Sequence, residues 1–207
     1  MDFSKQIVVD SNSLPWVASP KPGVLRKPLA REDAERGHAT SVVKYEAGAS
    51  FSEHGHPAGE EILVLDGVFS DESGDYPAGT YFRNPEGFRH APFSKDGCVI
   101  LVKLHQFQVD DRQRVCIDTN AGNWRPGIGN RQVLPLHSHG TESVALVRWP
   151  AGEVFQAHSH YGGEEIFVIS GEFSDEDGRY PGGTWIRSPH LSRHHPRVEV
   201  DTLIWVK

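Results

Sequence analysis

The chain is poor in sulfur-containing residues. Its 207 residues include only 2 cysteines and 1 methionine. Cys98 and Cys116 do not form a CxxC pair, and Cys98 lies in the apolar run CVILV, so we expect a buried free thiol. A disulfide-stabilised scaffold is therefore excluded as the source of stability.

Positive charge and long apolar runs are also scarce. The 21 Lys and Arg are outnumbered by 28 Asp and Glu, for a net charge of −7, which argues against a nucleic-acid partner. No 18-residue apolar run is present, and the first residues lack a signal-peptide pattern, so we expect no membrane partner and a cytoplasmic location. The locally basic stretch from Lys21 to Arg31 is interpreted as a solvated connector.

A sustained helical period is missing as well, whereas short runs rich in β-branched and aromatic residues are frequent. Turn clusters with Gly and Pro separate these runs, so we predict an all-β protein. The predicted strands lie at 41–45, 61–65, 80–82 and 98–104, and again at 144–149, 165–169, 184–186 and 203–206.

An internal repeat is the most informative feature of the chain. Residues 45–103 align with 149–207 without a gap, with 28 identities in 59 positions. Further upstream, Asp10-Ser11-Asn12 resembles Asp118-Thr119-Asn120, at an offset of 108. Such self-similarity predicts two copies of one module, and we place them at 1–112 and 113–207.

The repeat carries the same set of metal-binding side chains twice. The two histidines of an HxH pair project from one face of a strand, a carboxylate follows after a Gly-containing break, and a third His comes 30 residues later. Three imidazoles and a carboxylate suit divalent ions, of which we expect Zn²⁺, with Fe²⁺, Mn²⁺ or Ni²⁺ as alternatives. The predicted metal ligands are His54, His56, Glu60 and His90, and then His158, His160, Glu164 and His194.

Other polar residues near these ligands have more than one interpretation. A second HxH, at 137–139, has no counterpart in the first copy and is interpreted as a polar loop. His195 either supports the neighbouring ligand or faces solvent. The repeated arginines at 83, 89, 187 and 193 either bind an anionic substrate or pair with the acidic FSDE turns, and we favour the pairing.

These motifs resemble the cupin superfamily. The first cupin motif is similar to the pattern GxxFxxHxHxxxEExxxxxG in this chain. A shortened second cupin motif is similar to PxGTxxRxPxxxxH. Within the superfamily, the ChrR-like cupins are resembled by the longer pattern GEEIxVxxGxFSDExGxYPxGTxxRxP. The resemblance implies a bicupin: two tandem double-stranded β-helix (jelly-roll) barrels, with the eight residues above as ligands. ChrR anti-sigma factors also carry a helical zinc domain with a CxxC, which this chain lacks, so we do not expect it to bind a sigma factor.

Two functions lead on the sequence alone, ahead of a metal-requiring sugar-phosphate isomerase or epimerase, for which no phosphate-binding pattern is present. One is a metal-dependent sensor or ligand-binding regulatory protein, in which a small molecule binds near the metal. The other is a small metalloenzyme, an Fe(II)-dependent dioxygenase acting on a diketone-like molecule. No catalytic residue is assigned, and the oligomeric state is open, with a homodimer among the alternatives.

Overall fold

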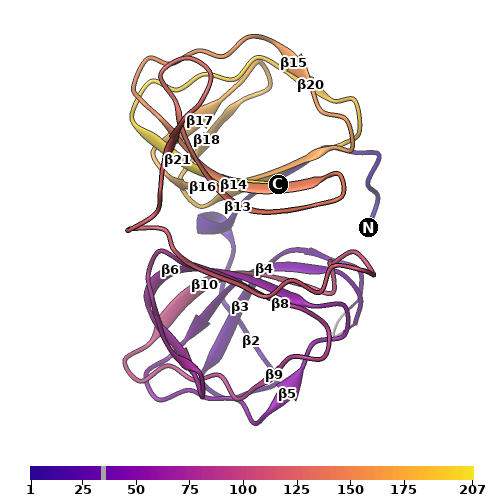
Figure 1. Ribbon diagram of the computed structural model, residues 1–207, viewed down its shortest axis with the longest axis vertical. Helices are drawn as coiled ribbons and strands as arrows, with labels where there is room; N and C mark the ends of the chain where they lie inside the picture. The colour runs from indigo at the N-terminus through magenta and orange to yellow at the C-terminus, as the bar shows by residue number, and fades with distance from the viewer. Residues whose placement is uncertain (34–35) are drawn as a thin grey trace. The chain divides into compact units, whose positions relative to one another are not determined.

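The computed structural model describes residues 1–33 and 36–207, which form two compact units of β-strands (Figure 1). Unit 1 consists of Leu14–Gly122 together with Met1, and unit 2 of Asp2–Ser13 and Asn123–Lys207. The one helical segment among the described residues is the short 3₁₀ turn η1 (Ser11–Ser13), and no described helix is long and apolar enough to cross a bilayer. The all-β fold class is confirmed.

Unit 1 is built on one large sheet, in the order β11-β8-β6-β10-β4-β3-β2, with β7 paired to β6 and a small β5-β9 sheet. Adjacent strands of the sheet are antiparallel. The strands are β2 (Val17–Ala18), β3 (Val24–Arg31), β4 (Ala39–Tyr45), β5 (His54–Gly55), β6 (Glu60–Asp71), β7 (Gly74–Pro77), β8 (Thr80–Asn84), β9 (Arg89–His90), β10 (Cys98–Leu104) and β11 (Val115–Asp118).

Unit 2 repeats this plan, with the sheet order β1-β19-β16-β21-β14-β13-β12 and two small sheets, β15-β20 and β17-β18. Its strands are β1 (Ile7–Asp10), β12 (Arg125–Pro126), β13 (Gln132–His139), β14 (Glu142–Trp149), β15 (His158–Ser159), β16 (Glu164–Ser170), β17 (Glu172–Ser174), β18 (Arg179–Pro181), β19 (Thr184–Ser188), β20 (Arg193–His194) and β21 (Thr202–Val206).

Each unit has a core of its own. In unit 1 the core includes Ile62, Val64 and Phe69, and in unit 2 it includes Ile166 and Val168. All eight predicted strand segments lie within observed strands. The β-branched and aromatic residues that favour strands in these segments also fill the two cores, so local propensity and tertiary packing favour the same strands.

Two segments that we expected to be irregular are strands. The basic stretch from Lys21 to Arg31 is not a connector, because most of it forms β3, which pairs with β4. The HxH pair at 137–139 is not a loop but the end of β13, with His137 buried. Both strands contain charged or imidazole side chains among short apolar residues, and these polar side chains were the reason to expect irregular structure. Hydrogen bonding to a neighbouring strand outweighs this local preference.

Each unit contains one strand that belongs, in sequence, to the other copy of the repeat. β1 pairs with β19 and belongs to unit 2, although it lies at the start of the first copy of the repeat; it is the indigo strand beside the orange and yellow ones in Figure 1. Its counterpart β11 pairs with β8 in unit 1. The division at 112/113 follows the repeat in sequence, and the compact units differ from it by this exchange.

Candidate metal centres

In each unit, a two-stranded sheet and the start of a long strand bring the predicted ligands together. In unit 1, β5 pairs with β9 so that His54 lies directly opposite His90. Glu60 is the first residue of β6, where the chain resumes after the Gly59 turn, which has a φ of 79°. A left-handed backbone is cheap for Gly, and the turn lets the carboxylate return to the two imidazoles.

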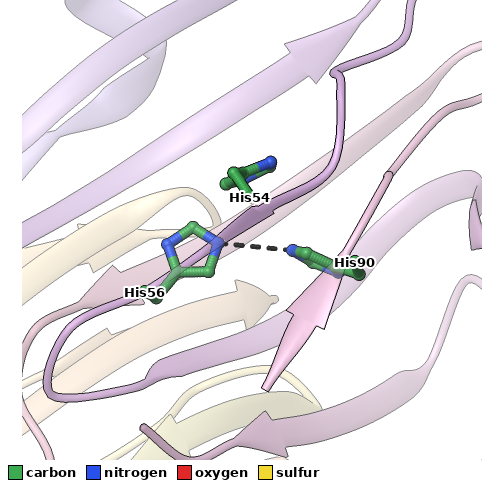
Figure 2. Close-up of side chains that lie close together, drawn as sticks. All are labelled: His54, His56 and His90. Atoms are coloured by element: carbon green, nitrogen blue, oxygen red, sulfur yellow. Dashed lines mark hydrogen bonds between the residues drawn. The ribbon is translucent and has the colours of Figure 1, made fainter. Parts of the chain in front are cut away.

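The donor atoms of unit 1 lie close together, as Figure 2 shows for the three imidazoles. The Nε2 atoms of His56 and His90 are 3.3 Å apart. The Glu60 carboxylate lies 3.4 Å from His56 Nε2 and 3.5 Å from His90 Nε2. Both His90 and Glu60 are buried.

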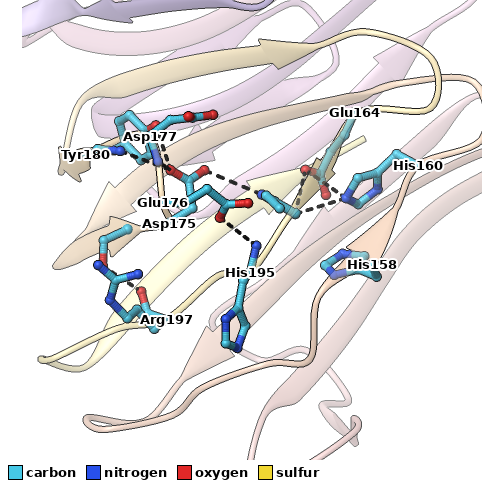
Figure 3. A network of polar contacts seen from close by, with 12 residues as sticks. His158, His160, Glu164, Asp175, Glu176, Asp177, Tyr180, His195 and Arg197 are labelled. Carbon is cyan, nitrogen blue, oxygen red and sulfur yellow. Dashed lines mark hydrogen bonds and ion pairs between the residues drawn. The ribbon is translucent and has the colours of Figure 1, made fainter.

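Unit 2 has the same arrangement (Figure 3). His158 lies opposite His194 in the β15-β20 pair. The Nε2 atoms of His160 and His194 are 3.0 Å apart, and Glu164 Oε2 lies 3.4 Å from the first and 3.7 Å from the second.

Backbone contacts orient the first imidazole of each cluster. His54 Nδ1 lies 2.9 Å from the Ser52 carbonyl oxygen, and His158 Nδ1 lies 3.0 Å from that of Gln156. A carbonyl can only accept, so each Nδ1 carries the proton and each Nε2 keeps its lone pair for a cation.

The donor sets fit a divalent cation. In each cluster, imidazole nitrogens and a carboxylate face one another, and few N–H or O–H groups are present to donate to these acceptors. Glu164 Oε2 is buried without a hydrogen-bond partner among the described residues. A buried acceptor left unpaired is costly, and a bound cation would satisfy it. The histidine clusters could therefore hold metal ions; the assignment of the eight ligands, the number of ions and their identity stay predictions.

The acidic residues of the FSDE turns support the third histidine, a role that we did not predict. Asp71 Oδ2 lies 3.5 Å from His90 Nδ1, and the Tyr76 hydroxyl donates to Asp71 Oδ1 at 3.1 Å. Glu72 accepts a hydrogen bond from the backbone N–H of Ala91 at 2.9 Å. A carboxylate on the outer nitrogen fixes the ring so that the other nitrogen faces the metal.

The same supports recur in unit 2. Asp175 Oδ2 lies 3.6 Å from His194 Nδ1, and Tyr180 donates to Asp175 Oδ1 at 2.9 Å. The Glu176 carboxylate accepts from the backbone N–H of His195 at 2.8 Å, and the His195 side chain is exposed (Figure 3). Of the two interpretations of His195, solvent exposure is therefore correct for its ring. The recurrence of the DE pair was visible in the repeat and could have identified this role.

For Arg83 and Arg89, the pairing with the FSDE turns that we favoured is wrong. Arg83 is fully buried and pairs with Glu61 at 3.3 Å and Asp111 at 2.6 Å. Arg89 pairs with Glu53, on the surface. Because the aspartates of the FSDE turns are taken up by the histidines and tyrosines, the buried arginine has its carboxylates on neighbouring strands and loops instead.

In unit 2, Arg187 is held differently from its counterpart Arg83. Its guanidinium donates to the Asp2 carbonyl oxygen at 2.9 Å and stacks over the Phe3 ring, at 4.5 Å from the centroid. Both arginines thus have structural partners outside the FSDE turns.

Burial sets the protonation of the inner donors. It lowers the pKa of His56 to about 3 and that of His160 to about 4, helped by the neighbouring imidazoles, so both are neutral near pH 7. Burial also raises the pKa of Glu60, and it raises that of Glu164 to about 7 against the opposing influence of His194. Neutral imidazole is the form that binds metal.

A cavity of about 710 Å³ in unit 1 adjoins its cluster. His54, His56 and Glu60 form part of its wall, and the remainder comes largely from the inner face of β3, β4 and β10. A pocket of about 470 Å³ in unit 2 contains none of the predicted ligands, and lies around Asn130 and Arg148. The cluster of unit 1 is therefore open to a small molecule.

Two tandem antiparallel barrels, each with a three-histidine cluster and an adjacent glutamate, define the class of bicupins. The sequence model of the ChrR Cupin-like domain family matches residues 4–108 and again 112–207. The chain belongs to this family. The search of curated proteins finds no match.

Solved structures support the same fold. A "putative dioxygenase" from Nostoc punctiforme is 16% identical, with a TM-score of 0.83 over 99% of this chain and 82% of that one. A pirin from Escherichia coli in complex with nickel(II) is 13% identical, with a TM-score of 0.70 over 98% and 97%. A variant of the oxalate decarboxylase of Bacillus subtilis is 14% identical, with a TM-score of 0.63 over 97% and 76%. At these identities the likeness shows the fold.

Proposed function

We propose that this protein is a metal-dependent, small-molecule-binding bicupin with a sensor or regulatory role, and that its ligand binds in unit 1. The observation that carries this proposal is the cavity of about 710 Å³ with His54, His56 and Glu60 in its wall. Binding sites for small molecules usually have volumes of about 300–1,000 Å³. A molecule in this cavity would lie against the metal ligands.

The residues of the cluster would hold the metal, and a bound divalent cation would supply a Lewis acid at the cavity wall. Neutral His56 and the backbone-oriented His54 would donate Nε2 lone pairs, and Glu60 a negative charge. Zn²⁺ is the ion that we propose, with Fe²⁺, Mn²⁺ and Ni²⁺ as alternatives; the nickel(II) complex of the structurally similar pirin supports a divalent ion.

The first test measures metal content. Protein purified without added metal should contain close to two divalent ions per chain by elemental analysis. The double variants H54A/H56A and H158A/H160A should each lose about one ion, and the double variants should remain folded by circular dichroism. Protein that retains no ion after incubation with any of the four metals would refute the proposal.

The second test asks whether unit 1 is the ligand-binding unit. Metal-loaded protein is screened with a library of small organic molecules by thermal shift, since a ligand that binds only the native state raises Tm. Hits should lose their effect in H54A/H56A and keep it in H158A/H160A. Hits that depend equally on both clusters, or on neither, would contradict the location in unit 1.

An Fe(II)-dependent dioxygenase is the second candidate, favoured by the open cavity beside the donors and by the shared fold of the Nostoc "putative dioxygenase". A dioxygenase needs room for substrate and O₂ at one metal, and a 3-His-1-Glu set serves such chemistry. The iron-loaded protein is incubated in air with acetylacetone and with quercetin. Oxygen consumption above that of H54A/H56A would support the enzyme, and its absence would support the sensor.

A further inference from the structure

Arginine residues form part of the wall of the unit 1 cavity. In the β3-β4 register, Arg26 lies opposite Val43 and Arg31 opposite Ala39. Directly paired residues of an antiparallel sheet project from the same face, and all four residues line the cavity. Arg36 lines it as well.

Arg31 shares a cross-strand row with a predicted metal ligand. The row runs from Arg31 on β3 through Ala39 on β4 and Leu104 on β10 to Glu60 on β6. All four residues line the cavity. Arg31 on β3, whose Nε donates to the Asp33 carbonyl oxygen at 3.3 Å, and the metal cluster beside β6 therefore line one space, with β4 and β10 between them.

The rest of the wall is largely apolar, and the described part of it contains one acidic residue, Glu60, whose charge a bound metal would offset. Three arginines thus line this wall, in a chain whose net charge is −7. The apolar part of the wall comes mainly from Val24, Val43, Phe51, Ile100, Val102 and Leu104. Such a wall suits a ligand with an apolar body and an anionic end.

Unit 2 lacks both guanidinium groups at these positions. β3 and β13 share a Pro-Leu pair, and both strands have a register shift after the proline. Matching the strands by this pair places Val133 at the position of Arg26 and Ser138 at that of Arg31. The register confirms the match, because Val133 lies opposite Val147 and Ser138 opposite Ser143, the repeat counterparts of Val43 and Ala39.

In unit 2, an arginine and two aromatic rings lie at the corresponding place. Arg131, at the position of Val24, stacks over the Phe155 ring at 3.7 Å and the Trp149 ring at 4.4 Å from the centroids. Phe155 and Trp149 are the repeat counterparts of Phe51 and Tyr45, which line the cavity of unit 1. The Arg131 guanidinium is thus held against aromatic rings.

We propose that unit 1 binds a small organic acid, with its carboxylate on Arg26 and Arg31, its apolar body along β4 and β10, and a second polar group toward the His54–His56 cluster. Planar guanidinium groups bind carboxylates through paired, charge-assisted hydrogen bonds, which also fix the orientation of the ligand. Unit 2 does not bind it. This inference rests on the proposed function, because it names the ligand class of the same site.

The experiment compares acids with neutral molecules of the same shape. Phenylacetate and benzoate, with phenylacetamide and benzamide as their amides, are titrated into the zinc-loaded protein by isothermal calorimetry. The acids should bind at least about tenfold more tightly than the amides, the gain of one charge-assisted contact. Equal affinities for acid and amide, or no acid binding up to about 10 mM, would overturn the inference.

Variants locate the contact. R26Q/R31Q should weaken binding of the acids by about tenfold or more, leaving zinc content and amide binding unchanged. R112Q is the matched control, because Arg112 pairs with Glu86 on the surface of the same unit and does not line the cavity. Unchanged acid binding in R26Q/R31Q would also overturn the inference.

The outcomes for the two proposals differ. If acid and amide bind alike but both need the His54–His56 cluster, the metal-dependent function stands and the acid specificity fails. If acid binding depends on Arg26 and Arg31 but persists in H54A/H56A, the acid site stands and its dependence on metal fails.

Discussion

At the scale of single residues, each cluster depends on side chains behind the donors. Asp71 and Asp175 stand at the outer nitrogens of His90 and His194, and a tyrosine hydroxyl holds each aspartate in turn. The order of contacts is the same in both units although the units are only about half identical. We therefore expect the aspartates to position the histidines rather than to bind metal themselves.

D71N should lower zinc affinity by about 10–100-fold, because the amide supports the imidazole less well as an electron donor to the metal. The zinc affinity is measured by competition with a chelating dye. The protein also carries H158A/H160A, so that only the cluster of unit 1 binds zinc. E86Q is a control, since Glu86 pairs with Arg112 away from the cluster. An unchanged affinity in D71N would show that Asp71 has only a packing role.

The second cluster should bind metal in a pH-dependent way. Burial raises the pKa of Glu164 to about 7, and metal binding requires its carboxylate, so a proton must leave below that pH. Zinc affinity should therefore rise with pH by up to about tenfold per unit below pH 7 and level off above it. His160, with a pKa of about 4, is already neutral in this range.

The measurement uses H54A/H56A protein between pH 6 and 8, with correction for protonation of the competing chelator. Burial alone would lower the pKa of His194, but the contact with Asp175 and the charges of Glu164 and Asp175 outweigh it, so the pKa is raised. It adds to the same trend. E164Q should bind zinc more weakly and with a shallower slope, and a flat profile in the parent would contradict the assignment.

At the scale of elements, the barrels depend on tight approaches between strands. Gly67 has a φ of 69°, and a Cβ there would meet the Gly97 carbonyl oxygen at 2.2 Å, beside the register shift between β6 and β10. Gly171 is the counterpart in unit 2, where a Cβ would meet the Asp201 carbonyl oxygen at 2.3 Å. The close backbone approach beside each register shift thus requires glycine for space as well as for conformation.

G67A should destabilise the protein by about 2–5 kcal/mol, from the left-handed backbone and the clash together. G48A separates the two causes, because Gly48 has a φ of 78° but no atom within 4 Å of the added Cβ. It should cost only about 1–2 kcal/mol. Urea unfolding measures both, and equal losses would show that the close approach to β10 does not matter.

At the scale of the whole molecule, the exchanged strands tie each unit to a remote part of the sequence. Asn12 donates to the Gly182 carbonyl oxygen at 2.8 Å, and Asn120 donates to that of Ala78 at 2.9 Å. The repeated Asp-x-Asn segments therefore carry the same contact in the two units. Neither unit has all of its edge strands within one copy of the repeat.

Removal of residues 1–13 should destabilise unit 2 and leave unit 1 folded, because β19 would lose β1 and become an exposed edge. Hydrogen exchange should show faster exchange in β19 and β16, with β8 and β6 unchanged. N12A is a milder test, with an expected loss of about 1 kcal/mol. Equal loss of protection in both units would contradict this assignment of β1 to unit 2.

Local sequence determined much of this protein. The strand segments and the repeated donors could be predicted because β-branched runs and the spacing of two histidines constrain residues that are near one another in sequence. The FSDE acids were visible as a repeat, but their partners were not. A buried arginine or aspartate takes whichever group the fold places beside it, as Arg83 takes Asp111.

Only the tertiary structure decided which side chains share a space. Arg31 and Glu60 are 29 positions apart in sequence and lie in one cross-strand row because β3, β4, β10 and β6 pair in a particular register. That register includes a shift in β3, which the local sequence does not predict. The strand exchange is also decided by the tertiary structure. The backbone of β1 or β11 can hydrogen-bond to any exposed sheet edge, and the fold determines that β1 pairs with β19 and β11 with β8. Register and edge pairing are properties of the assembled sheet, so the placement of Arg31 and Glu60 along one wall follows from the fold.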